Sequence, residues 1–210
     1  MFNIDLYSEI SKKIDLLGKK TKIVAISKNH PKTSIEIAIN HGVRIFGENR
    51  VQEAKHKFND LKTKYSNLQL HLTGPLQTNK VNEAISLFDI FHTLDREKLA
   101  REFVKVGRLD KKIFFIQVNT GKEENKSGIY PEQLSGFVEY CKKDLSLNVV
   151  GLMCIPPIKD DPKEHFAFLV NEAKKNSLQQ LSMGMSSDYP RAIELNATYI
   201  RLGTALFGSR

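Results

Sequence analysis

Residues 22–39 read KIVAISKNHPKTSIEIAI, and this segment sets the pattern for the whole chain. Its β-branched and apolar residues predict a buried strand that ends at the polar pair Ser27-Lys28, and Pro31 with Thr33 then begins an amphipathic helix. The same order of strand, polar end and helix recurs along nearly the whole sequence. Such alternation predicts a parallel β-sheet connected by helices.

Eight segments carry the strand pattern, namely Lys22–Ser27, Arg44–Gly47, Leu70–Gly74, Ile90–Leu94, Ile113–Val118, Val149–Met153, Gln180–Met183 and Tyr199–Leu202. Between them the apolar period becomes that of a helix, as it does at Val51, Ala54, Phe58 and Leu61. A further amphipathic segment with Leu6, Ile10, Ile14 and Leu17 precedes the first strand and stops at Gly18. It predicts an extra N-terminal helix.

Eight strands separated by helices predict an α/β fold, a single (β/α)8 barrel of the TIM type over residues 1–210. An open, doubly wound sheet is the alternative. Nearly every strand ends in a polar or glycine cluster, such as Glu48-Asn49, Thr73-Gly74 and Gly203-Thr204. Because one rim made of many strand ends is typical of a barrel, we favour the barrel, and no linker divides it into two domains.

The composition is that of an ordinary globular protein, with 40% hydrophobic and 27% charged residues. Apolar stretches are far shorter than the ~18 residues of a membrane helix, and the N-terminus has no signal-peptide pattern, so we expect a cytoplasmic protein. The net charge of +8 is spread over lysine doublets, which indicates a solvated surface rather than a nucleic-acid site. Cys141 and Cys154 form no C-x-x-C pair, and we expect both to be buried.

Lys28 is a candidate nucleophile because it follows a strand at the rim where barrel sites lie. A partly buried lysine there can lose its proton and form a Schiff base. The alternative is an ordinary surface lysine in a loop.

The loops after the seventh and eighth strands are candidates for a phosphate site. Ser186, Gly203 and Thr204 are the predicted anchor, although Ser186-Ser187-Asp188 is equally an ordinary helix cap. Arg201 lies in an apolar strand, where an unpaired guanidinium is costly to bury. We therefore expect Arg201 to have a specific partner: a structural carboxylate, an anionic substrate or a cofactor ring nitrogen.

Metal chemistry finds no support in the sequence. The histidines form no H-E-x-x-H pair, and neither a G-x-S-x-G elbow nor a Walker glycine-lysine loop is present. His71 on the third strand is, by position alone, most simply a core histidine.

Several motifs, in order along the chain, resemble those of the pyridoxal 5'-phosphate homeostasis proteins, often called the YggS or PROSC type. They are Ala25 to Lys28 (AISK), Phe46 to Glu53 (FGENRVQE), His71 to Lys80 (HLTGPLQTNK), Lys126 to Gly128 (KSG), Gly151 to Met153 (GLM), Leu181 to Ser186 (LSMGMS) and Arg201 to Gly208 (RLGTALFG).

This resemblance implies a barrel like the N-terminal domain of alanine racemases, with pyridoxal phosphate bound at the rim. By the same resemblance, Lys28 is the Schiff-base lysine, Arg201 faces the pyridine nitrogen, and Asn49 and His71 lie near the ring. The residues implied for the phosphate are Ser186, Gly203 and Thr204. The implied role is vitamin B6 homeostasis by a monomer that carries the cofactor, with pyridoxal phosphate-dependent apoenzymes as possible partners.

Alanine racemases use a second base from another domain, and we expect no such domain because the sequence ends at Arg210. An arginine at the pyridine nitrogen also weakens the electron sink. The sequence therefore predicts a non-catalytic binding protein. A weak amino-acid racemase or lyase is the main alternative, and a basic nucleic-acid-binding or partner-binding module is a third.

Overall fold

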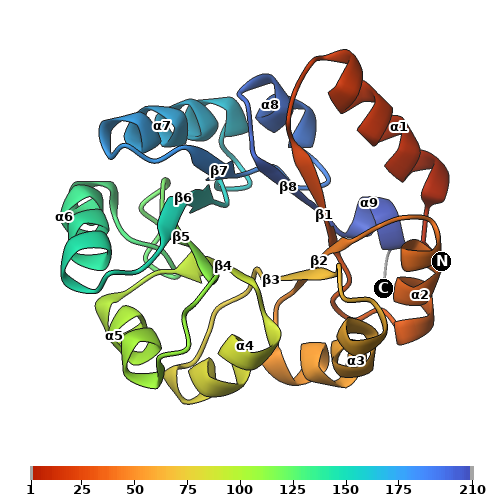
Figure 1. Ribbon diagram of the computed structural model, residues 1–210. Helices are drawn as coiled ribbons and strands as arrows, with labels where there is room; N and C mark the ends of the chain where they lie inside the picture. The colour runs from red at the N-terminus through yellow and green to blue at the C-terminus, as the bar shows by residue number, and fades with distance from the viewer. Residues whose placement is uncertain (1, 209–210) are drawn as a thin grey trace.

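Eight parallel strands pair around a closed ring in the computed structural model, which describes residues 2–208 (Figure 1). Each strand neighbours the next in sequence, and β8 returns to β1. The strands are β1 (Lys22–Ile26), β2 (Ile45–Glu48), β3 (Gln69–Leu72), β4 (Ile90–Leu94), β5 (Ile113–Val118), β6 (Val149–Cys154), β7 (Gln180–Ser182) and β8 (Tyr199–Leu202). The predicted α/β barrel is confirmed.

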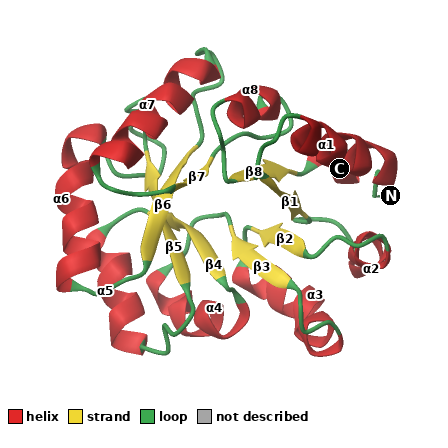
Figure 2. Ribbon diagram, turned by 45° about the horizontal axis from the view of Figure 1, so that its top comes forward, coloured by secondary structure: helices red, strands yellow, loops and turns green. Residues whose placement is uncertain are grey.

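The helices form an outer ring around this barrel (Figure 2). They are α1 (Ile4–Leu16), α2 (Lys32–Asn40), α3 (Val51–Lys64), α4 (Val81–Leu87), α5 (Glu97–Val106), α6 (Leu134–Glu139), α7 (Pro162–Lys175), α8 (Tyr189–Glu194) and α9 (Thr204–Phe207). Shorter helical turns are η1 (Thr78–Lys80), η2 (Pro131–Gln133) and η3 (Tyr140–Asp144). None of these described helices is both long and apolar enough to cross a membrane.

The helix α1 is the predicted extra N-terminal helix. The Asn3 side chain caps it by accepting a hydrogen bond from the Leu6 backbone N–H at 3.0 Å. The Asn3 N–H in turn donates to the carbonyl of Leu206 at 2.7 Å, which fastens α1 to α9. The helix ends one residue before Leu17, which is 49% exposed and therefore does not join the buried stripe expected from the sequence.

The apolar core has two parts. The larger lies between the strands and the surrounding helices, where the predicted stripe of α3 is buried. The smaller fills the inside of the barrel with Val24, Ile26, Ile90, Phe115, Met153 and Tyr199. Because strand side chains alternate between these two faces, most strands contribute to both parts, whereas β3 and β7 direct the polar His71 and Ser182 inward instead.

Two histidines complete the barrel interior. His71 from β3 and His92 from β4 are fully buried, and their ring nitrogens Nδ1 and Nε2 lie 2.9 Å apart. The His92 ring stacks on Phe115 with 4.8 Å between centroids, and the His71 ring meets Tyr199 edge-on at 5.0 Å. Burial, with smaller contributions from Lys22 and Lys62, lowers the pKa of His71 to about 3. Burial likewise holds the pKa of His92 well below its ordinary value.

This histidine pair should make the protein less stable as the pH falls. Below pH 6.5 the histidines bind protons in the unfolded chain, whereas the His71 imidazole in the folded protein stays neutral until the pH approaches 3. The free energy of unfolding is therefore highest above pH 6.5 and decreases as the pH falls towards 3. His71 should contribute a slope of about 1.4 kcal/mol per pH unit over that window, and His92, whose pKa is also lowered, acts in the same direction. Urea unfolding of the parent and of a His71→Leu/His92→Leu variant, at pH 7 and about pH 5, measures the difference. Equal losses in both proteins would contradict the assignment of two neutral rings.

Candidate functional site

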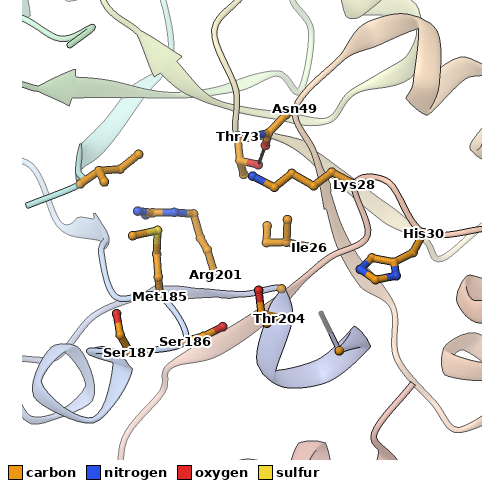
Figure 3. Close-up of a pocket in the computed structure, with 13 residues that line it drawn as sticks. Ile26, Lys28, His30, Asn49, Thr73, Met185, Ser186, Ser187, Arg201 and Thr204 are labelled. Atoms are coloured by element: carbon orange, nitrogen blue, oxygen red, sulfur yellow. Dashed lines mark hydrogen bonds between the residues drawn. The ribbon is translucent and has the colours of Figure 1, made fainter. Parts of the chain in front are cut away.

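A cavity of about 340 Å³ opens at the carboxyl ends of the strands (Figure 3). Six of the seven residues predicted from the sequence line it: Lys28, Asn49, Ser186, Arg201, Gly203 and Thr204. The structure does not bring His71 there. The other lining residues, which the sequence analysis did not single out for the site, are Ile26, His30, Thr73, Ile155, Met185, Ser187 and Gly208. The cavity has the size and rim position typical of a small-molecule site in a barrel.

Lys28 enters the cavity from the loop after β1. Its side chain is half-buried, and in Figure 3 its amine lies beside Thr73. The next residue, Asn29, has a φ of 62°, in the left-handed region that asparagine tolerates better than most residues. The chain therefore turns sharply directly after Lys28.

A buried ionic cluster holds the peptide groups on both sides of Lys28. The Lys57 ammonium, from α3, donates to the Ser27 carbonyl at 2.8 Å, to Glu48 at 3.0 Å and to Glu53 at 2.6 Å. Glu53 also accepts a hydrogen bond from the Asn29 backbone N–H, and Glu48 accepts one from the Ser27 hydroxyl at 2.7 Å. These contacts fix Ser27 and Asn29, so the backbone of Lys28 has little freedom.

The two carboxylates of this cluster have different environments. Burial raises the pKa of Glu48, and Lys57 and Ser27 offset only part of that effect. Burial also opposes ionisation of Glu53, but the hydrogen bonds from Lys57 and Asn29 outweigh it and lower the pKa of that carboxyl. The Oε2 atom of Glu48 is buried and has no hydrogen-bond partner among the described residues. The i,i+4 spacing of Glu53 and Lys57 on α3 is a local signal for half of this cluster, whereas Glu48 and Lys57 are brought together only by the fold.

Arg201 reaches the cavity from β8 and is 5% exposed. Its Nη1 donates to the Ser182 hydroxyl at 2.6 Å, and its Nη2 donates to the Cys154 carbonyl at 2.9 Å. Burial lowers the pKa of the guanidinium. Among residues 2–208, no carboxylate forms an ion pair with it. The first of the three partners that the sequence offered for Arg201, a structural carboxylate, is therefore wrong. Arg201 retains N–H groups that can donate to an acceptor in the cavity.

The loops after β7 and β8 meet at the opposite end of the cavity from Lys28 (Figure 3). The Ser186 hydroxyl accepts a hydrogen bond from the Ala205 backbone N–H at 3.3 Å, which joins the two loops. The backbone N–H groups of Ser186, Gly203 and Thr204 have no acceptor within the described part of the chain. A cluster of such donors at a cavity suits an anionic group.

Asn49 and Thr73 form the wall beside the Lys28 amine. The Thr73 hydroxyl donates to Asn49 Oδ1 at 2.9 Å, as the dashed line in Figure 3 shows. Gly74 packs so closely behind Asn49 that a Cβ atom would lie 2.5 Å from the Asn49 carbonyl oxygen. Only glycine fits there, and this close approach fixes where Asn49 stands.

The chain is similar to several known proteins. The family model "Alanine racemase, N-terminal domain" matches residues 7–210. A pyridoxal phosphate homeostasis protein from Aquifex aeolicus is 38% identical over 200 residues, covering 90% of this chain and 87% of that protein. The protein of the same name from Synechocystis is 35% identical over the full length of both chains.

Solved structures agree with these matches. PipY of Synechococcus elongatus, in a structure with pyridoxal phosphate bound, has a TM-score of 0.79 and 36% identity, covering 90% of this chain and 93% of that one. Alanine racemase from Corynebacterium glutamicum matches all of this chain but 62% of its own length, with a TM-score of 0.72 and 15% identity. The second likeness shows a shared fold.

Replacing Lys57 should destabilise the protein strongly. Lys57→Met would leave Glu48 buried without its cation, and breaking a buried ion pair in this way costs about 3–5 kcal/mol. Lys32→Met is a matched control, because Lys32 pairs with Asp60 at 3.1 Å on the surface. That exposed pair should be worth at most about 1 kcal/mol. Urea unfolding measures both, and equal small losses would show that the cluster does not hold the loop.

Proposed function

The chain belongs to the family of pyridoxal phosphate homeostasis proteins, and we propose that it binds pyridoxal 5'-phosphate in the cavity at the barrel rim. The observation that carries this proposal is the meeting of three kinds of group in one cavity: the Lys28 amine, the buried Arg201 guanidinium and the backbone donors at Ser186, Gly203 and Thr204. The named relatives and the ligand of PipY support the same ligand.

The cavity residues match the chemical parts of this cofactor one by one. When bound, pyridoxal phosphate supplies an aldehyde that condenses with amines and a ring that withdraws electrons. In this proposal Lys28 holds the aldehyde as a Schiff base, Arg201 donates to the ring nitrogen, and Asn49 lies beside the ring. Ser186 and the backbone N–H groups of Gly203 and Thr204 bind the phosphate through several charge-assisted hydrogen bonds. His71 does not line the cavity and acts on the site from outside it.

We infer further that the protein holds the cofactor without robust catalysis, as part of intracellular vitamin B6 homeostasis. Arg201 supports this inference, because a guanidinium only donates hydrogen bonds and so favours an unprotonated ring nitrogen, which weakens electron withdrawal. Within residues 2–208, the cavity lining also includes no tyrosine that could serve as a second base. Apoenzymes that need the cofactor are the proposed recipients.

One domain, a monomeric state and a cytoplasmic location complete the proposal. The matched family model spans residues 7–210 as one unit. Cys141 and Cys154 are both buried free thiols, which suits a reducing compartment.

Lys28 should carry the cofactor covalently. Reduction with borohydride and peptide mapping should find a pyridoxyl phosphate group on Lys28 after incubation with pyridoxal phosphate. The Lys28→Ala variant should lose this adduct, whereas Lys32→Ala, which changes a nearby surface lysine, should retain it. An adduct confined to another lysine of the unmodified protein would overturn the assignment.

Exchange of the α-proton of alanine should separate a carrier from an enzyme. The loaded protein, incubated with L- or D-alanine in deuterated water, should exchange this proton no faster than free pyridoxal phosphate does. NMR of the amino acid measures the rate. Exchange at enzymatic rates that disappears in Lys28→Ala would instead establish the racemase alternative.

A further inference from the structure

His71 is connected to the cavity although it does not line it. A line of hydrogen bonds crosses the barrel interior from β3 through β4 and β7 to β8. Gln69 Oε1 lies 3.0 Å from His71 Nε2, and His71 Nδ1 lies 2.9 Å from His92 Nε2. On the other side of His92, its Nδ1 lies 2.7 Å from Ser182 Oγ, which in turn lies 2.6 Å from Arg201 Nη1. Its last member is the guanidinium that points into the cavity (Figure 3).

The direction of this line follows from its two ends. Arg201 can only donate, so Ser182 Oγ accepts from it. At the other end, Gln69 Oε1 accepts from His71 Nε2–H, which leaves His71 Nδ1 as an acceptor for His92 Nε2–H. His92 Nδ1 then accepts the Ser182 hydroxyl proton, and each ring carries its proton on Nε2.

The reverse direction leaves a polar group unsatisfied. If the Gln69 amide were turned round, both histidines would donate towards β7, and Ser182 would accept from His92 and from Arg201 together. The Ser182 hydroxyl proton would then have no acceptor among the described residues, in a side chain that is fully buried. An unpaired buried donor costs about 1–3 kcal/mol, so the first direction is favoured.

The surroundings of the line keep both rings neutral. The aromatic rings of Phe115 and Tyr199 cover His92, and Tyr199 also covers His71. The charged groups that act on the pair, Lys22, Lys62 and Arg201, are all cationic and oppose protonation. Neutral imidazoles with one donor and one acceptor each can transmit a fixed direction, which two charged rings could not.

We propose that His71, His92 and Ser182 are positioning residues that hold the Arg201 guanidinium in place against the ring nitrogen of the cofactor. The proposal rests on the function proposed above. Ser182 offers Arg201 only an acceptor, because its own proton is committed to His92. Two N–H groups of the guanidinium are thereby held by Ser182 and the Cys154 carbonyl, and the rest of its donors remain for the cavity.

A cofactor analogue that lacks the ring nitrogen isolates this effect. The unmodified protein should bind pyridoxal phosphate more tightly than its 1-deaza analogue, in which carbon replaces that nitrogen. Ser182→Ala should reduce this preference about tenfold, since it removes a hydrogen bond to a charged group. His71→Leu, which touches neither Arg201 nor the cavity, should reduce it about threefold through the loss of one neutral hydrogen bond. Fluorescence titration with each ligand gives the dissociation constants.

Thr21→Val is the matched control for a lost buried hydroxyl. Thr21 donates to the Ala197 carbonyl at 2.6 Å just before β1, at the other end of the barrel. This variant should lose stability but keep the full preference for pyridoxal phosphate. If Ser182→Ala weakens both ligands equally, as a purely structural residue would, the positioning role is overturned.

The proton positions can be measured without any cofactor. In the unmodified protein, ¹⁵N NMR should show both buried imidazoles neutral and protonated on Nε2, whether or not the variants fold. A ring protonated on Nδ1, or a charged ring at pH 7, would overturn the proposal. Failure of the unmodified protein to bind pyridoxal phosphate would instead refute the proposed function, and with it the ligand named here, while the NMR result would still report on the line itself.

Discussion

The pairing of β8 with β1 is the constraint on which the site depends. Val24 lies opposite Arg201, and Ala25 opposite Leu202, in a parallel register. Parallel strands place their carboxyl ends at the same edge, so Lys28 and Thr204 arrive at one rim although 176 residues separate them in the sequence. A shift of one residue would move Arg201 from the barrel interior to the helix side and dismantle the cavity.

Two buried cations near this rim are stabilised in different ways. Lys57 has two carboxylates and a carbonyl, so its charge is compensated within the protein. Within residues 2–208, Arg201 has only a neutral hydroxyl and a carbonyl at hydrogen-bond distance. Desolvating a cation that has no carboxylate in an ion pair with it is costly, and perturbed charged groups of this kind are concentrated at functional sites. The contrast separates a cation that shapes the loop from one that is available to bind.

Much of the fold could be predicted because each strand and helix carries its own apolar period. The strands at Ile90–Leu94, Ile113–Val118 and Tyr199–Leu202 match their predicted limits, whereas the other five shift by one or two residues at an end. The rim residues Lys28 and Thr204 could also be predicted, since each lies two positions after the end of a strand. The contacts of Lys57 with Glu48 and of His71 with His92 could not be predicted, because these partners come from other strands and no local apolar period reports contacts across a barrel. Leu17 shows that the apolar period can also mislead, because the period predicts a buried residue where the helix has already ended and the side chain is exposed.

The histidines inside the barrel are harder to explain by packing than by binding. Apolar side chains of similar size would fill the same volume, and replacing buried polar groups by hydrophobic ones is often neutral or stabilising. Packing alone therefore does not explain why histidines occupy these two positions, but their hydrogen bonds do. Each buried imidazole nitrogen has a partner, and the line connects the partly buried Gln69 at one end with Arg201 at the other. A fully satisfied polar line rigidifies its end members, and here one end member is the Arg201 guanidinium, which lines the cavity.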